Sequence, residues 1–65
     1  NILAAPLIEL APAFTAAVAP GATILLAGLL DSQAEAVIAS YEAYGCKLID
    51  RGSGEWRVLL LEKRA

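Results

Sequence analysis

Histidine and methionine are absent from this chain of 65 residues, and cysteine occurs once, at Cys46. One cysteine excludes an internal disulfide framework, and the lack of histidine removes the usual ligands of a structural zinc site. A lone thiol is typical of a reducing, cytoplasmic setting, where it behaves as a small buried hydrophobe. We therefore expect a cytoplasmic protein with no metal site, in which Cys46 has a packing role.

Charged residues are few, and the positive ones are scattered. Five Lys and Arg residues stand against seven Asp and Glu residues, for a net charge of −2. A surface that binds nucleic acid needs clustered cations to replace the counterions of the phosphates. The composition therefore argues against nucleic acid as a partner.

The longest uncharged stretch runs from Leu10 to Leu30 and is long enough to span a bilayer. Pro12 and the Pro20-Gly21 pair interrupt it, so a helix, a turn and a strand describe it better than one membrane helix. No basic leader precedes the apolar run, as a secretory signal would require. The sequence therefore predicts no membrane segment.

Hydrophobic residues, in contrast, make up 58% of the chain. At this length, apolar burial at about 25 cal/mol per Å² only just offsets an ordering cost of roughly 1.5 kcal/mol per residue. Short chains usually depend on disulfides, metals or oligomerisation. The apolar excess thus predicts faces that pack against the rest of a larger chain or against a second copy.

A helix is predicted from the first residues to about residue 18. Large apolar side chains recur along one stripe, at Leu3, Leu7, Leu10, Phe14 and Val18. Pro6 suits a first helical turn, where its missing N–H costs nothing. Pro12 does not suit a helix interior, so we expect a kink or a restart there, with Ala11 outside helical geometry. A turn at residues 19–21 closes the element.

The stretch from Ala22 to Leu30 predicts a strand that is apolar on both faces. One face would carry Thr23, Leu25, Ala27 and Leu29, and the other Ile24, Leu26, Gly28 and Leu30. Such a strand is typical of an α/β sheet that is covered on both sides, and it favours parallel neighbours. The predicted helices of this chain suffice to cover only one of those sides.

A second helix follows, with clear signals at both ends. Asp31 or Ser32 is expected to cap it, and Ser32 with Glu35 fits a capping box. Its buried stripe is predicted to comprise Ala34, Val37, Ile38 and Tyr41. Gly45 fits the left-handed position that ends a helix.

Two further strands are predicted around the Gly-Ser-Gly at residues 52–54. These glycines lack the spacing and the following helix of a phosphate-binding loop, so they indicate a hairpin turn. The expected order is helix, strand, helix, strand, strand, with the last two strands antiparallel.

Three stretches then resemble one family: "NILAAPLIELAPAF" at 1–14, "PGATILLAGLLDSQAEAV" at 20–37 and "GEWRVLLLEKR" at 54–64. An α/β sheet that closes with this element order resembles the C-terminal part of a Rossmann-like class I S-adenosylmethionine-dependent methyltransferase, whose last strand lies antiparallel between the fifth and the sixth. The stretches together closely resemble the PrmA-type enzymes, which methylate bacterial large-subunit ribosomal protein eleven. The resemblance covers residues 1–65 as the C-terminal portion of the catalytic domain.

The resemblance implies a functional site at the "NILA" opening. In this fold the fourth strand ends in a short motif beside the transferred methyl group, at the edge where open α/β sheets bind ligands. Asn1 is then the candidate catalytic residue, and Asn1, Ile2, Leu3 and Ala4 are the candidate cofactor-binding residues. An asparagine amide can accept from the attacking amine and donate to the cofactor. Methyl transfer depends chiefly on positioning, which such contacts serve.

Other parts of the family pattern are missing from these residues. The glycine-rich loop that would hold the methionine end of S-adenosylmethionine is absent, as is the acidic residue that would bind its ribose. The chain alone is therefore predicted neither to bind the cofactor measurably nor to methylate a ribosomal protein.

Two alternatives stay open. The chain is either part of this enzyme or a stand-alone α/β interaction module that homodimerises through its exposed apolar sheet; a homo-oligomer is expected of the isolated chain in both cases. A methyltransferase with another substrate also fits "NILA", because substrate choice depends on segments outside these residues.

Overall fold

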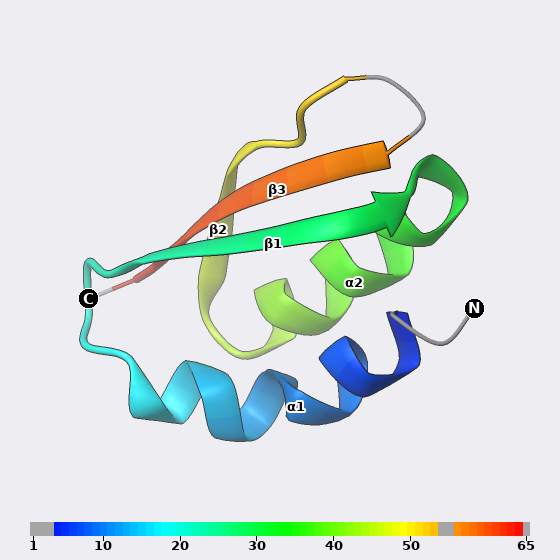
Figure 1. The fold of residues 1–65 in the computed structure, drawn as a ribbon. Coiled ribbons are helices and arrows are strands. Elements are labelled where there is room, and N and C mark those ends of the chain that lie inside the picture. Colours follow the sequence, from blue (N-terminus) through cyan, green and yellow to red (C-terminus); the bar gives the residue numbers. More distant parts are fainter. Residues whose placement is uncertain (1–3, 54–55, 65) are drawn as a thin grey trace.

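The computed structural model describes residues 4–53 and 56–64. Its elements are, in order, α1 (Ala4–Ala17), β1 (Thr23–Leu30), α2 (Asp31–Ala43), β2 (Cys46–Asp50) and β3 (Trp56–Lys63). This is the expected order of helix, strand, helix, strand and strand (Figure 1). The α/β fold class is confirmed.

The three strands form one sheet in the order β1-β3-β2, and β3 is antiparallel to both neighbours. β1 and β2 therefore run parallel to each other with β3 between them (Figure 1). The prediction that β1 has parallel neighbours was wrong for its one neighbour in the described part. The connection through α2 places β2 two strand positions from β1, so these two strands do not pair. The β2–β3 hairpin then inserts β3 between them.

Both helices lie on one face of the sheet, here called the inner face (Figure 1). α2 lies directly against the strands, and α1 packs along α2. The fully buried core consists of Ala11, Ile24, Leu26, Leu29, Ala34, Val37, Ile38, Tyr41, Cys46, Leu59 and Leu61. On the opposite, outer face no described helix covers the strands, and Leu25 is 63% exposed.

α1 continues through Pro12 without a break. The predicted restart was wrong, because Ala11 is helical and fully buried. Pro12 is exposed, so its ring faces solvent and does not disturb the contact with α2. Ala11 and Thr15, on either side of Pro12 in the sequence, are both buried and hold this part of the helix in the core.

The buried stripe of α1 also differs from the predicted one. Leu7, Phe14 and Val18 pack against the core as expected, but Leu10 is 52% exposed. The buried positions of α1 are instead Ala11 and Thr15. Leu3 lies outside the described residues.

β1 contains a bulge that the alternation of its sequence did not reveal. Its register against β3 slips by one residue between Leu26 and Leu29, where Gly28 has a φ of +79°. A positive φ favours glycine, and an extra residue in one strand turns the following side chains over. Leu29 therefore joins Ile24 and Leu26 on the inner face, instead of the outer face that strict alternation predicted.

α2 begins at Asp31, one residue after β1 ends. The expected Ser32–Glu35 capping box is not formed; Gln33 takes the role instead, because its Oε1 accepts from the N–H of Leu30 at 3.0 Å. The predicted buried stripe is confirmed in full. The predicted helix end is confirmed as well, since Gly45 has a φ of +92°.

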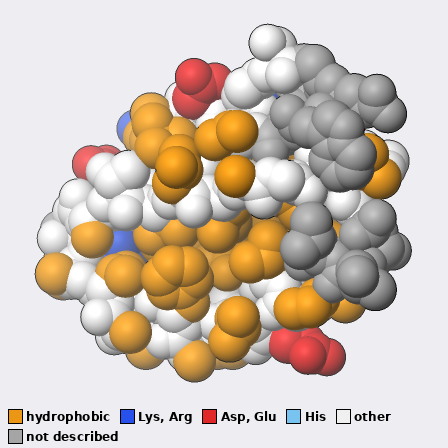
Figure 2. Space-filling model, viewed as in Figure 1, with side chains coloured by type: hydrophobic (Ala, Val, Ile, Leu, Met, Phe, Trp, Pro, Cys, Tyr) orange, Lys and Arg blue, Asp and Glu red, His pale blue; other side chains and the backbone are white. Residues whose placement is uncertain are grey.

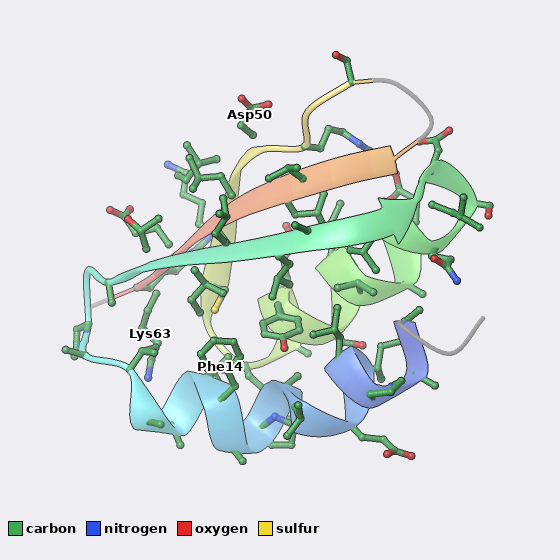
Figure 3. All side chains as sticks on the ribbon, in the orientation of Figure 1. Phe14, Asp50 and Lys63 are labelled. Carbon is green, nitrogen blue, oxygen red and sulfur yellow. The ribbon has the colours of Figure 1, made fainter. Side chains whose placement is uncertain are left out.

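The β2–β3 hairpin is confirmed. In its loop the N–H of Gly52 donates to Asp50 Oδ1 at 2.9 Å, and Asp50 lies on the outer side of the sheet (Figure 3). Gly52 has a φ of +65°, and a Cβ there would lie 2.9 Å from the carbonyl oxygen of Val58. These two constraints require glycine at this position.

Candidate functional site

The candidate site lies where α1 begins. Ala4 is the first residue of α1 and is half-buried against the core. Asn1, Ile2 and Leu3 lie outside the described residues, so their assignment stays a prediction.

α1 begins at the same end of the molecule at which β1 ends and α2 begins (Figure 1). In a sheet with parallel strands this end is the carboxyl edge, outside which open α/β folds bind their ligands. Thus Ala4 and the hairpin loop lie on the side of the sheet on which the sequence analysis placed the ligand.

An ion pair joins two elements at this edge. Arg51 Nη1, in the hairpin loop, lies 2.6 Å from Glu35 Oε2, in the first turns of α2. The side chains are 38% and 74% exposed, so the pair adds little stability. Its role is to hold the loop beside α2. The sequence analysis missed it because charge pairing across elements leaves no pattern along the chain.

Gln33 joins two further parts of the edge. Its Oε1 accepts from the N–H of Leu30, the last residue of β1. Its Nε2 is buried and has no hydrogen-bond partner among the described residues. Buried side-chain amides normally bond through both ends. Gln33 is thus a polar side chain of this edge whose Nε2 donor is unpaired among the described residues.

The model of the ribosomal protein L11 methyltransferase (PrmA) family matches residues 1–64. The chain belongs to this family. The resemblance noted in the sequence is thereby confirmed.

Individual relatives carry the same name. Ribosomal protein L11 methyltransferase of Brucella suis is 58% identical over 45 residues, which are 69% of this chain and 16% of the relative. That of Rhodopseudomonas palustris is 47% identical over 64 residues, or 97% of this chain and 22% of the relative. The chain spans about a fifth of the length of this second relative.

In this PrmA-family chain, the last turn of α1 is held at the end of the molecule opposite to the candidate site. Lys63, on β3, points from the sheet toward α1, and Nζ donates to the carbonyl oxygens of Thr15 and Val18 (Figure 3). A cation at a helix C-terminus is favourable, because the last carbonyls are unpaired and the dipole is negative there. Lys63 therefore has a structural role.

Two titratable side chains lie in the core. Burial raises the pKa of Cys46. The nearby Lys63 ammonium lowers this pKa, but by less. Burial also raises the pKa of Tyr41, with a smaller contribution from Cys46. The Tyr41 hydroxyl donates to the carbonyl oxygen of Leu7 at 3.0 Å, and its ring meets the edge of Phe14 at a centroid distance of 6.3 Å. Both groups are neutral and serve packing, as expected for Cys46.

The surface of the side that carries β1 and α1 is largely apolar. Figure 2 shows a band of hydrophobic side chains between these two elements, and Phe14 points into this region (Figure 3). No described strand pairs with this edge of β1.

Within the described residues no helix is long and apolar enough to cross a membrane.

Proposed function

We propose that this chain is the C-terminal portion, residues 1–65, of the catalytic domain of an S-adenosylmethionine-dependent methyltransferase. The intact enzyme transfers methyl groups to lysine or N-terminal amines of a large-subunit ribosomal protein in the cytoplasm. The family match over residues 1–64 is the observation that carries this proposal. The small share of each relative that the chain covers supports its being part of a longer enzyme.

The direction of the crossovers supports the position of the site. β1 leads through α2, on the inner face, to the parallel strand β2. Crossovers of this kind are right-handed in nearly all proteins, and α1 leads into β1 on the same face. The strand before α1 therefore belongs at the edge of β1 that no described strand pairs. Its last residues then reach the carboxyl edge.

At that position Asn1 is suited to a positioning task. Its amide oxygen can accept from the substrate amine, and its amide N–H₂ can donate to an acceptor on the cofactor. The carbonyls of Ile2 and Leu3 offer further acceptors, and Ala4 completes the wall. Holding the amine in line accounts for much of the rate of a transfer of this type.

The described residues do not by themselves fit the cofactor. Residues 4–53 and 56–64 form no cavity. Gly52 and the rest of the hairpin loop precede a strand, and not the helix whose N-terminus would receive an anion. S-adenosylmethionine, which supplies the methyl group when bound, is thus held mainly by the rest of the longer enzyme.

Methylation assays test the assignment. In the longer polypeptide that contains this sequence, Asn1→Ala should lower kcat for methylation of the ribosomal protein by about a hundredfold, as loss of a positioning contact does. Glu9→Gln, on the exposed side of α1, is the matched control and should retain full activity. Full activity of Asn1→Ala would remove Asn1 from the site. No methylation by the unaltered polypeptide would overturn the function.

The isolated chain is a separate case. Titration calorimetry with S-adenosylmethionine should give no measurable heat of binding for the 65 residues alone, whereas micromolar affinity would contradict the proposed division of the site.

We further propose that the isolated chain forms a homo-oligomer through the outer face of its sheet. The exposed Leu25, Ile49 and Val58 on the strands support this.

A further inference from the structure

The sheet has two outer edges, and they differ in how well they are protected. Within the described residues β3 lies between β1 and β2, so each of these two strands has one edge without a strand partner. β2 is short, carries the exposed Lys47 and Asp50, and has a register shift before Asp50. Charges and irregularities of this kind protect an edge from pairing with another chain. β1 is longer, Thr23–Leu30, and contains neither a charged residue nor a proline.

The main chain of β1 offers donors and acceptors at its open edge. The N–H of Lys63, on β3, donates to the carbonyl oxygen of Ala22 at 2.9 Å, so this carbonyl faces β3. In an antiparallel pair, successive residues alternate between facing the partner strand and facing away from it. The N–H and C=O groups of Thr23 and Leu25 therefore face the open edge. Both residues are exposed, and the regular alternation ends at the bulge that contains Gly28.

Apolar side chains lie next to this edge on both sides of the sheet. On the outer face the side chain of Leu25 is 63% exposed. On the inner side an apolar band lies between β1 and α1, and Phe14 points into it (Figure 2, Figure 3). A strand that is added to this edge would gain main-chain hydrogen bonds and would also remove apolar area from water.

A second copy of the chain fits this edge by symmetry. Two β1 strands related by a two-fold axis run antiparallel and are complementary to each other. The regular part of β1 extends from Thr23 to Ala27, so the axis falls at Leu25, and no like charges meet. Pairing of β1 with β2 of the next copy would instead involve the charged edge of β2, and it would continue into an open filament. The β1–β1 pair closes after two copies.

We propose that the isolated chain dimerises by antiparallel pairing of β1 with β1 of a second copy, centred on Leu25. Each Leu25 N–H donates to the Leu25 carbonyl oxygen of the other copy. The two Leu25 side chains lie side by side on the outer face, with their Cβ atoms about 5 Å apart. This contact gives the proposed self-association a second surface beside the outer face. It belongs to the isolated chain, because in the longer enzyme, on the proposed function, the strand before α1 takes the same edge.

Removal of one main-chain donor tests the pairing, since a chain of 65 residues can be made by chemical synthesis. N-methylation of Leu25 keeps the side chain and removes the N–H at the open edge. It should raise the dissociation constant of the dimer, measured by sedimentation, about tenfold or more, because each copy loses one hydrogen bond. Circular dichroism shows whether the methylated chain is folded. An unchanged dissociation constant would overturn the proposal.

N-methylation of Leu48 is the matched control. The N–H of Arg64 donates to the carbonyl oxygen of Gly45 at 2.9 Å, so this carbonyl faces β3. By the same alternation the N–H of Leu48 faces the open edge of β2. The modification and the residue type are thus the same, but the edge is the other one. The dissociation constant should not change, and an increase equal to that of N-methylated Leu25 would contradict pairing through β1.

A substitution on the outer face separates edge pairing from contact between faces. Ile49, on β2, is 49% exposed. Ile49→Lys places a charge on the outer face away from the open edge of β1, so the chain should still form a dimer. A monomeric Ile49→Lys chain would show that association depends on the outer face and would overturn the proposal.

Hydrogen exchange of the unaltered chain needs no variant. Exchange of the Thr23 and Leu25 amide protons should slow as the chain concentration rises through the dissociation constant, while exchange at Leu48 should stay the same. Concentration-independent exchange at Leu25, or a clean monomer at tens of micromolar, would refute the pairing. None of these readouts depends on methylation, so the inference can fail while the proposed function holds, and the reverse.

Discussion

Both faces of β1 carry apolar side chains, but their surroundings are very different. On the inner face Ile24, Leu26 and Leu29 are at most 4% exposed, beneath α2. On the outer face Leu25 is 63% exposed, and it lies opposite Leu60 of β3 in the register of the sheet. The difference shows that the side chains of β1 are apolar enough to be buried on both faces of the strand. The described helices cover only the inner face.

The largest expected effect distinguishes the two faces directly. Leu29→Ala removes a fully buried side chain and should lower the free energy of unfolding by about 2–5 kcal/mol. Leu25→Ala, the matched change on the outer face, should lower it by less than about 1 kcal/mol in a monomeric chain, since little area is lost from the core. Urea denaturation followed by circular dichroism measures both. Equal losses would show that the outer face is also buried.

A smaller effect is expected at the contact between the helices that cover the inner face. Tyr41→Phe keeps the ring against Phe14 and removes the hydrogen bond to the Leu7 carbonyl. It should cost about 0.5–1.5 kcal/mol, the net worth of one such bond. Tyr44→Phe, at an exposed tyrosine, is the control and should be neutral. An unchanged midpoint for Tyr41→Phe would show that α1 is held without this bond.

The inner face should also respond to pH. The folded pKa of Cys46 is raised above its ordinary value of 9.0, so the folded state keeps a proton that the unfolded state releases. Stability is therefore complete below about pH 9 and falls as the pH rises through the folded pKa. Denaturation between pH 7 and 11 measures the slope, and Cys46→Ala should reduce it. Tyr41, whose pKa is raised too, accounts for the remainder.

The smallest effect on stability is expected on the outer face, together with a change of assembly. Leu25→Lys places a charge on an exposed position and should alter the free energy of unfolding by no more than about 0.5 kcal/mol. The same change should shift the isolated chain toward monomer in sedimentation experiments, because the charge must be desolvated in any contact through this face. A wild-type chain that is monomeric at tens of micromolar would refute self-association.

Local sequence signals predicted the elements well where a residue in the pattern is compatible with only one structural role. The stripe of α2, its end at Gly45 and the hairpin around Gly52 all follow from periodicity and from positive φ angles. Prediction failed where two explanations compete. Gly28 read as an ordinary strand residue and not as a bulge, and Pro12 read as a helix breaker although its exposed position makes it tolerable.

The site residues predicted at 1–4 stay a prediction, because only Ala4 lies within the described residues. The motif at 1–4 pointed to the end of α1 that the structure places at the carboxyl edge. The Arg51–Glu35 pair and the half-satisfied amide of Gln33 had no counterpart in the sequence analysis. The proximity of Arg51 and Glu35 depends on how the hairpin and α2 converge, and the burial of Gln33 depends on how α2 packs.

By itself the sequence determined the α/β class, the element order and the family, because these depend on local periodicity and on motifs read in order along the chain. The position of β3 between β1 and β2 follows from the family resemblance, whereas the tertiary structure alone decided that Leu29 turns inward and that Gln33 replaces Ser32 and Glu35 at the start of α2. The inward turn of Leu29 depends on its register against β3, a strand distant along the chain, and no local pattern encodes that register. The Gln33 bond joins residues only three apart, and the structure decides it because several polar side chains at the start of α2 compete for the same role.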